Sequence, residues 1–170
     1  MSFSSGTELF ALFNPRNPNA KFDTDDLLKA ARGMGLNLEV FAASTEPEID
    51  RFFGTLAARP ASAFLTISDS FFYSRRNQIT MLAAYHKIPA IYDVRTYVDA
   101  GGLMSYAPDY PEGFRQAGLY TGRILKGEKA SDLPIIQPTK FEFVLNLVAA
   151  KALGLIIPAS VLAIADEVIE

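Results

Sequence analysis

The chain has 170 residues, and it contains no cysteine, no tryptophan and only one histidine. Without cysteine it can form neither disulfides nor thiolate metal sites, and it has no thiol nucleophile. With His86 alone, a zinc ion would depend almost entirely on carboxylates, which zinc disfavours. The sequence therefore predicts neither a metal centre nor another cofactor.

Charge and hydropathy exclude two further classes of partner. The net charge of −3 gives no electrostatic reason to expect nucleic acid. Charges or prolines interrupt every apolar run before it reaches the ~18–20 residues of a membrane span. Residues 1–6 show neither a basic region nor an apolar core of a secretory signal, so a complete chain of this kind is expected in the cytoplasm.

Catalytic motifs are scarce. Gly33 and Gly35 lack the third glycine of a dinucleotide fingerprint, and no phosphate-binding loop with a Gly-Lys-Ser/Thr end is present. His86 falls at the end of a predicted helix and has no serine or aspartate at the spacing of a hydrolytic triad. The acidic cluster at 23–26 is typical of a helix N-terminus, where carboxylates meet the helix dipole favourably. We therefore expect no catalysis.

Short apolar runs alternate with helical stripes along the first 127 residues. The runs are continuous rather than alternating, which is typical of strands buried on both faces of a parallel sheet. We expect a three-layer α/β fold with the flavodoxin-like strand order 2-1-3-4-5. The predicted strands are 9–13, 38–41, 63–67, 89–92 and 103–106.

The C-terminal part does not fit this repeating unit. The spacing predicts an α/β lobe over 7–127, a proline-containing linker over 128–140 and a strand-helix tail over 141–170. A helical face between Phe114 and Leu125 ends before Gly127, which closes the predicted lobe.

Polar side chains lie just beyond the carboxyl ends of the predicted strands. Ligands bind at this edge in open parallel sheets. Asp69, Ser70 and Asp93 are equally good N-caps of the following helices, so each of them can cap a helix, contact the ligand, or do both. Arg95 either pairs with a ligand carboxylate or lies in solvent. The predicted ligand contacts are Asn14, Asp69, Ser70, Tyr92, Asp93 and Tyr106.

Several of these segments carry a family resemblance. The run 89–106, the segments 13–18 and 69–72, and most of 124–170 resemble ABC transporter substrate-binding proteins. The branch that they resemble has the type I periplasmic-binding fold and includes aromatic amino-acid binders. The resemblance implies two α/β lobes with the ligand between them, and this chain matches only the second lobe and the tail. Asp93 and Ala107 depart from the small or weakly polar residue and the glycine that are usual there.

The resemblance implies a solute-binding component of an ABC-type importer, or a shortened descendant of one. Such a protein would bind a small organic solute, for example an amino acid, and would have an ABC permease as its membrane partner. The alternative is a protein–protein interaction or dimerisation module derived from a binding-protein lobe. A small hydrolase or phosphotransfer domain has the least support.

The tail leads to a separate expectation. Between Phe141 and Ile164 it carries many large apolar side chains, and each contributes roughly 1.5–3 kcal/mol when buried. An exposed strand at 141–145 would also pair with a free sheet edge. We therefore expect a twofold homodimer through the tails, and a monomeric lobe once the residues after Pro138 are deleted.

Overall fold

The computed structural model describes residues 8–59 and 62–170. Thr7, the expected start of the lobe, lies outside these ranges. The elements in chain order are β1 (Glu8–Phe13), α1 (Ala20–Gly33), β2 (Leu38–Ala42), α2 (Glu46–Ala57), β3 (Ser62–Thr66), α3 (Ser70–Ser74), α4 (Arg76–Tyr85), β4 (Ala90–Tyr92), α5 (Thr96–Asp99), β5 (Met104–Pro108), α6 (Tyr110–Leu125), the 3₁₀ turn η1 (Ala130–Asp132), β6 (Phe141–Asn146), α7 (Leu147–Leu153), α8 (Ala159–Leu162) and β7 (Glu167–Ile169).

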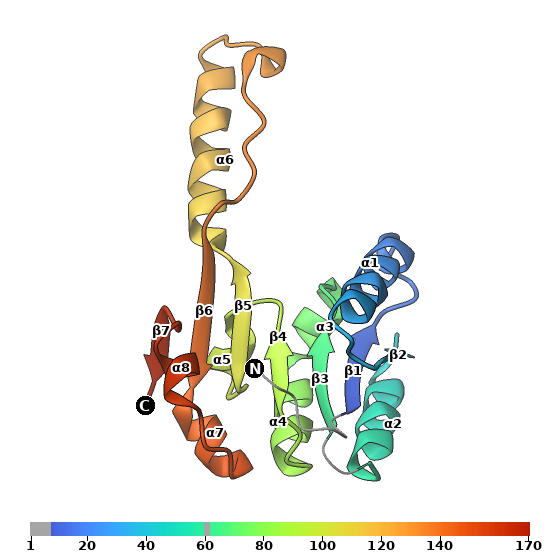
Figure 1. Ribbon diagram of the computed structural model, residues 1–170. Helices are drawn as coiled ribbons and strands as arrows, with labels where there is room; N and C mark the ends of the chain where they lie inside the picture. Colours follow the sequence, from blue (N-terminus) through green and yellow to red (C-terminus); the bar gives the residue numbers. More distant parts are fainter. Residues whose placement is uncertain (1–7, 60–61) are drawn as a thin grey trace.

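The strands form a single sheet in the order β2-β1-β3-β4-β5-β6-β7 (Figure 1). The first five are parallel and stand in the predicted order, so the α/β fold is confirmed. β6 runs antiparallel to β5, and β7 is parallel to β6. The carboxyl ends of β1, β3 and β4 therefore lie along one edge of the sheet.

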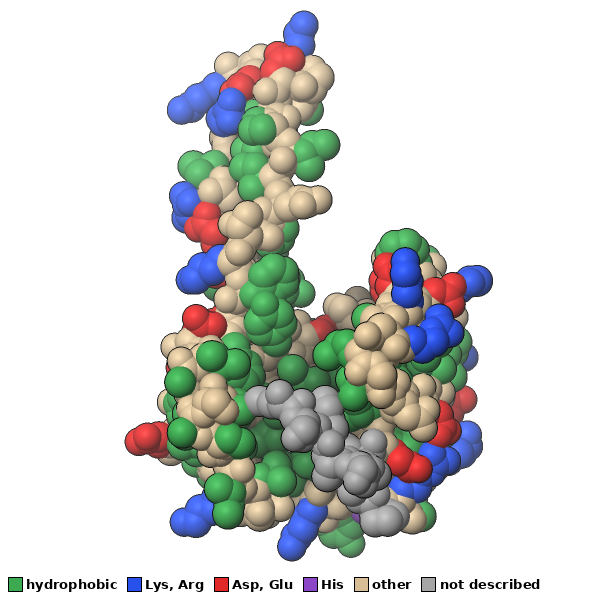
Figure 2. Space-filling model, in the orientation of Figure 1, with side chains coloured by type: hydrophobic (Ala, Val, Ile, Leu, Met, Phe, Trp, Pro, Cys, Tyr) green, Lys and Arg blue, Asp and Glu red, His purple; other side chains and the backbone are tan. Residues whose placement is uncertain are grey.

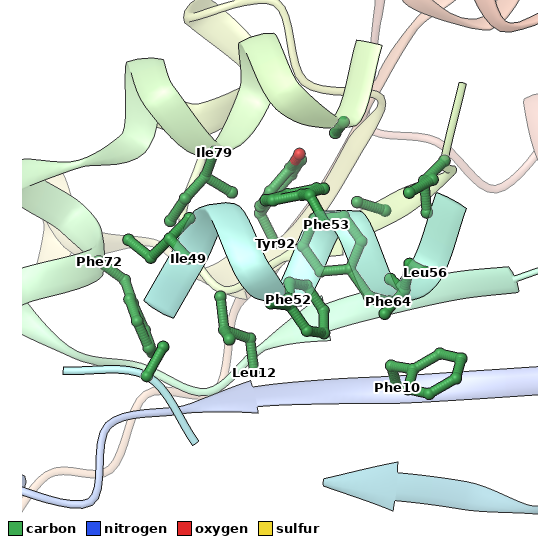
Figure 3. Close-up of a cluster of buried hydrophobic side chains, with 14 of the residues drawn as sticks. Phe10, Leu12, Ile49, Phe52, Phe53, Leu56, Phe64, Phe72, Ile79 and Tyr92 are labelled. Carbon is green, nitrogen blue, oxygen red and sulfur yellow. The ribbon is translucent and has the colours of Figure 1, made fainter. Parts of the chain in front are cut away.

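The larger core lies between one face of the sheet and the helices α2 to α5. α2 carries four buried apolar residues at helical spacing, and they pack onto side chains of β1, β3 and β4. Phe64 on β3 is at the centre, with its ring 5.4 Å from that of Phe52 and 5.3 Å from that of Phe53, both edge to face. Figure 3 shows these rings interlocking beneath α2.

A smaller core lies on the other face of the sheet, where α7 covers β5 and β6. Leu145, Leu103 and Ala150 are buried there. Leu145 follows Val144, which points to the opposite face, and both side chains are 0% exposed. β6 is thus buried on both faces, as expected of an internal strand.

The tail therefore belongs to the lobe's own sheet. The expectation that its strand pairs with a neighbouring subunit is wrong, because β6 pairs with β5 over residues 104–108 of the same chain. The free edge of β5 could not be predicted, since a strand's apolar run does not determine which strand it pairs with.

α6 differs from the other long helices because it leaves the body of the molecule. It stands beyond the sheet edge, and the chain returns beside it into β6 (Figure 1). We call residues 110–140 the arm. Not one of the sixteen residues of α6, all of which the structure describes, is buried. The lobe predicted over 7–127 is corrected here: its last helix lies outside the packed body, whereas β6 and β7 lie inside it.

Candidate ligand site at the carboxyl edge of the sheet

Asp69 joins the loops that follow β1 and β3. Its carboxylate accepts hydrogen bonds from Nδ2 of Asn14 at 3.0 Å and from Nδ2 of Asn17 at 2.9 Å. It also accepts one from the backbone amide of Phe71 at 2.9 Å, and so caps α3. With three donors, this carboxylate is largely occupied by its own chain.

Asp93, which follows β4, is less occupied. It is half-buried and accepts one hydrogen bond, from Oγ1 of Thr66 at 2.9 Å. Among the residues that the structure describes, no lysine or arginine forms an ion pair with it. Burial, and then the nearby Asp93 carboxylate, raise the pKa of the Tyr97 and Tyr110 hydroxyls. The edge therefore carries a carboxylate without a cationic partner, close to two tyrosines.

Tyr92 lies in the core, which corrects its prediction as a rim residue. It is only 2% exposed, and its ring stacks on that of Tyr97 with the centroids 4.6 Å apart. Its side chain points to the same face as Ala90, into the larger core, because alternate residues of a strand share a face. Within the described part of the chain its hydroxyl has no hydrogen-bond partner, and burial raises its pKa.

Gly102 leaves the space that this tyrosine occupies. A Cβ there would lie 2.5 Å from Cε2 of Tyr92 and 2.8 Å from the carbonyl oxygen of Tyr97. We expect Gly102→Ala to lower the free energy of unfolding by ~1–3 kcal/mol, as overpacking does. Urea denaturation measures this. The matched control is Gly54→Ala in α2, where a Cβ meets nothing within 4 Å. Equal midpoints for the two variants would contradict the steric argument.

The other two predicted contacts lie at the surface. Ser70 is exposed at the first position of α3. Tyr106 is 56% exposed and stacks on Phe141 of β6, with ring centroids 5.4 Å apart and planes 11° apart. This aromatic pair stands at the foot of the arm. Of the predicted contacts, Asn14 and Asp69 are therefore hydrogen-bonded to each other. Tyr106 instead contacts Phe141 of the neighbouring strand.

Arg95 forms ion pairs within the chain. Its guanidinium forms a two-pronged ion pair with Glu167 of β7, one prong being Nη2 to Oε1 at 2.6 Å. The carboxylate of Asp99 lies 3.4 Å from Nε of Arg95, and that of Glu142 lies 3.7 Å from its Nη1. The hydrogen bond to Glu167 raises the pKa of Arg95, and it lowers the pKa of that carboxyl. The sequence analysis expected Arg95 either to pair with a ligand carboxylate or to lie in solvent. Neither expectation describes this ion pair with the tail.

Sequence reasoning missed four polar residues of the edge, which are Asn17, Thr66, Tyr97 and Tyr110. Asn17 had a usable signal, because it stands in the same Asn-Pro loop as Asn14. Thr66 lies within the strand predicted at 63–67, where a polar side chain is usually assigned to the fold, and no motif marks Tyr97. Tyr110 opens a helix that the sequence placed against the sheet.

Comparison with known proteins decides the family. The family model described as ABC transporter substrate binding protein matches residues 6–169. The chain belongs to this family. A curated relative, the tyrosine-binding protein of Clostridioides difficile (strain R20291), is 23% identical over 144 residues, which are 85% of this chain and 41% of the relative.

Two solved structures have the same fold. The ABC domain in complex with L-Trp from Streptococcus pneumonia matches with a TM-score of 0.85 and 26% identity. A conserved domain protein from Vibrio cholerae matches with a TM-score of 0.85 and 24% identity. Each match covers 96% of this chain and 55% of the solved chain. The chain therefore spans about half the length of the proteins that it matches. Within the described ranges, every helix is too short or too polar to cross a membrane.

Proposed function

We propose that this chain is a solute-binding component of an ABC-type importer. In this proposal it binds a small organic solute such as an amino acid at the carboxyl edge of the sheet, without catalysis. Asn14, Asp69, Ser70, Asp93 and Tyr106 contact the solute. An ABC permease is the membrane partner, and the site of action is periplasmic or extracellular, as in the family.

The single observation that carries this proposal is the half-buried Asp93 carboxylate without a cationic partner among the described residues. A partly buried charge is stabilised by an opposite charge, which the ammonium group of an amino acid supplies. The stacked rings of Tyr106 and Phe141 offer an apolar face at the same edge of the sheet. Two relatives are described by their amino-acid ligands, tyrosine and L-Trp, which agrees with this ligand class.

Asp93→Asn tests the proposal. The amide oxygen can still accept from Thr66, so the fold is kept while the charge is lost. In a thermal-shift and calorimetric panel of amino acids, we expect wild type to bind weakly, because one lobe covers less than the usual ~70–90% of a ligand. The variant should lose about 10–100-fold in affinity, since a hydrogen bond to a charged group contributes roughly 1.5–3 kcal/mol.

The matched control is Asp50→Asn. Asp50 also accepts one neutral hydrogen bond, from Nε2 of Gln78 at 2.9 Å, but it is an exposed residue of α2 and is not among the proposed solute contacts. The Asp50→Asn variant should bind amino acids with the affinity of wild type. Equal binding by Asp93→Asn, or no binding by wild type at millimolar amino acid, would contradict the proposal.

A second candidate function, a protein–protein interaction module, is favoured by the uncovered arm. Its helix buries none of its side chains, although Phe114 and Leu125 are large and apolar. Apolar surface gathered on one element is typical of an interaction site.

A further inference from the structure

The carboxyl edge of the sheet carries an arginine without an acidic partner. Arg76 is the first residue of α4 and is half-buried. Its Nη1 donates to the carbonyl oxygen of Tyr73 at 3.1 Å, and its guanidinium lies over the Tyr73 ring, 5.1 Å from the centroid. Among the residues that the structure describes, none forms an ion pair with this guanidinium. A half-buried charge is stabilised by a counter-charge, so Arg76 is available to an anion from outside the chain.

The other arginines near this edge are paired or lie in solvent. Nη2 of Arg75 is 2.7 Å from Oε1 of Glu46, and Arg95 is held by Glu167. Arg16 is exposed in the loop after β1, where water solvates a guanidinium. Within the described part of the edge, Arg76 is therefore the half-buried arginine that its own chain leaves without a counter-charge.

The packing of α4 beside α5 places Arg76 near the residues that follow β4. Oγ1 of Thr80 in α4 donates to the carbonyl oxygen of Ala100, at the end of α5, at 3.0 Å. Arg76 lies one turn before Thr80, and Tyr97 lies about one turn earlier in α5 than Ala100 does. Both helices follow a strand that ends at the carboxyl edge, so one turn back from this contact leads toward that edge. Arg76 and Tyr97 are thus at the level of Asp93.

Charges of both signs act on the Tyr97 hydroxyl. Burial raises its pKa most, the Asp93 and Asp69 carboxylates raise it further, and the Arg76 guanidinium lowers it. Asp93 and Arg76 therefore both lie near this hydroxyl, but these two described side chains form no ion pair with each other. Two opposite charges that are close but unpaired suit a ligand that carries both signs.

The space above this edge is open to such a ligand. Figure 2 shows the molecule hollowed between the arm and α1, above the carboxyl ends of the strands. An α-amino acid carries its ammonium and carboxylate groups on the same carbon atom. Its two charges can therefore meet an acid and an arginine that lie close together without touching.

We propose that Arg76 pairs with the carboxylate of the solute and so makes this edge selective for zwitterions. This inference rests on the proposed function, in which Asp93 pairs with the ammonium group. Tyr73 holds Nη1 of Arg76 and so fixes the direction of the guanidinium. Nε and Nη2 donate to no acceptor among the described residues, and together they form the planar fork that binds a carboxylate through two hydrogen bonds.

NMR titration with L-phenylalanine and 2-phenylethylamine tests the proposal, because the two probes differ only in the carboxylate. We expect wild type to bind phenylalanine about 10–100-fold more tightly than the amine, as for hydrogen bonds to a charged group. Arg76→Gln should lose about this factor for phenylalanine and should bind the amine at least as tightly as wild type does. Asp93→Asn should instead weaken the binding of both probes.

The matched control is Arg75→Gln, which removes the neighbouring arginine whose counter-charge is Glu46. It should bind phenylalanine with the affinity of wild type. If Arg76→Gln bound phenylalanine equally well while Asp93→Asn did not, the role of Arg76 would be overturned and the proposed function would stand. A wild type that binds neither probe would contradict the proposed function, and this inference with it. Equal losses of phenylalanine affinity in the Arg75 and Arg76 variants would also overturn it, because they would show a general effect of removing positive charge.

Discussion

A chain that ends at Pro138 is expected not to fold. This truncation removes β6 and β7, and with them Val144 and Leu145, which are both 0% exposed in the full chain. β5 would become a bare edge, with Leu103 and Ser105 uncovered. Each large side chain removed from the core costs roughly 1.5–3 kcal/mol, and a domain of this size has only about 5–15 kcal/mol of net stability. Circular dichroism and urea denaturation measure the loss.

A shorter truncation provides the control for this result. Removing only residues 167–170 deletes β7, an edge strand of half-buried residues, together with Glu167, the partner of Arg95. We expect this variant to stay folded with a lower urea midpoint, because β6 still covers β5. A stable, cooperatively folded chain ending at Pro138 would contradict the assignment of the tail to the sheet. It would restore the independent lobe expected from the sequence.

The sequence was sufficient for the parallel part of the sheet. The strands β1 to β5 are short, continuous apolar runs in the sequence, and the helices between them have regular apolar stripes. In the structure β1 is buried on both faces, whereas β4 and β5 each carry an exposed residue between buried ones. Both signals are local, and the handedness and compactness of βαβ units then leave few strand orders. The order 2-1-3-4-5 could therefore be predicted without any knowledge of contacts.

Long-range placement was not available from the sequence. The apolar face of α6 has the same spacing as that of α2, yet α2 is buried and α6 stands apart. The period of a stripe shows that a face is apolar, but it does not show what covers the face. The same limit applies to Phe141–Leu145, whose run predicted a strand but not its pairing with β5.

The candidate site was predicted by position and only partly by residue. Polar residues after the strands did gather at one edge, because carboxyl ends of parallel strands meet there. The prediction that Tyr92 contacts the ligand was wrong for a local reason. A shift of one residue along a strand turns the side chain to the opposite face, here from the rim into the core. Asp69 and Asp93 looked alike as cap residues, and only the structure shows that Asp69 accepts three hydrogen bonds whereas Asp93 accepts one, from Thr66.

Phe64→Ala is expected to be among the most destabilising single substitutions in this chain. Phe64 is 2% exposed on β3, an interior strand of the sheet, and its ring packs edge to face on those of Phe52, Phe53 and Tyr92. Truncating a buried phenylalanine to alanine typically costs 3–5 kcal/mol, roughly, because the transfer energy is lost and a cavity stays behind. Favourable edge-to-face contacts, each worth about 0.5–1.5 kcal/mol, are lost as well.

Urea denaturation of three variants separates this cavity effect from a general intolerance of phenylalanine loss. Phe64→Leu should cost much less than Phe64→Ala, since leucine keeps most of the buried carbon. Phe22→Ala is the matched control, because Phe22 is 70% exposed on α1 and its loss leaves no cavity. It should stay within about 0.5 kcal/mol of wild type. If Phe64→Ala and Phe22→Ala unfolded at the same urea concentration, the aromatic cluster would not be the centre of the core, because a buried ring with three aromatic neighbours cannot be removed without loss.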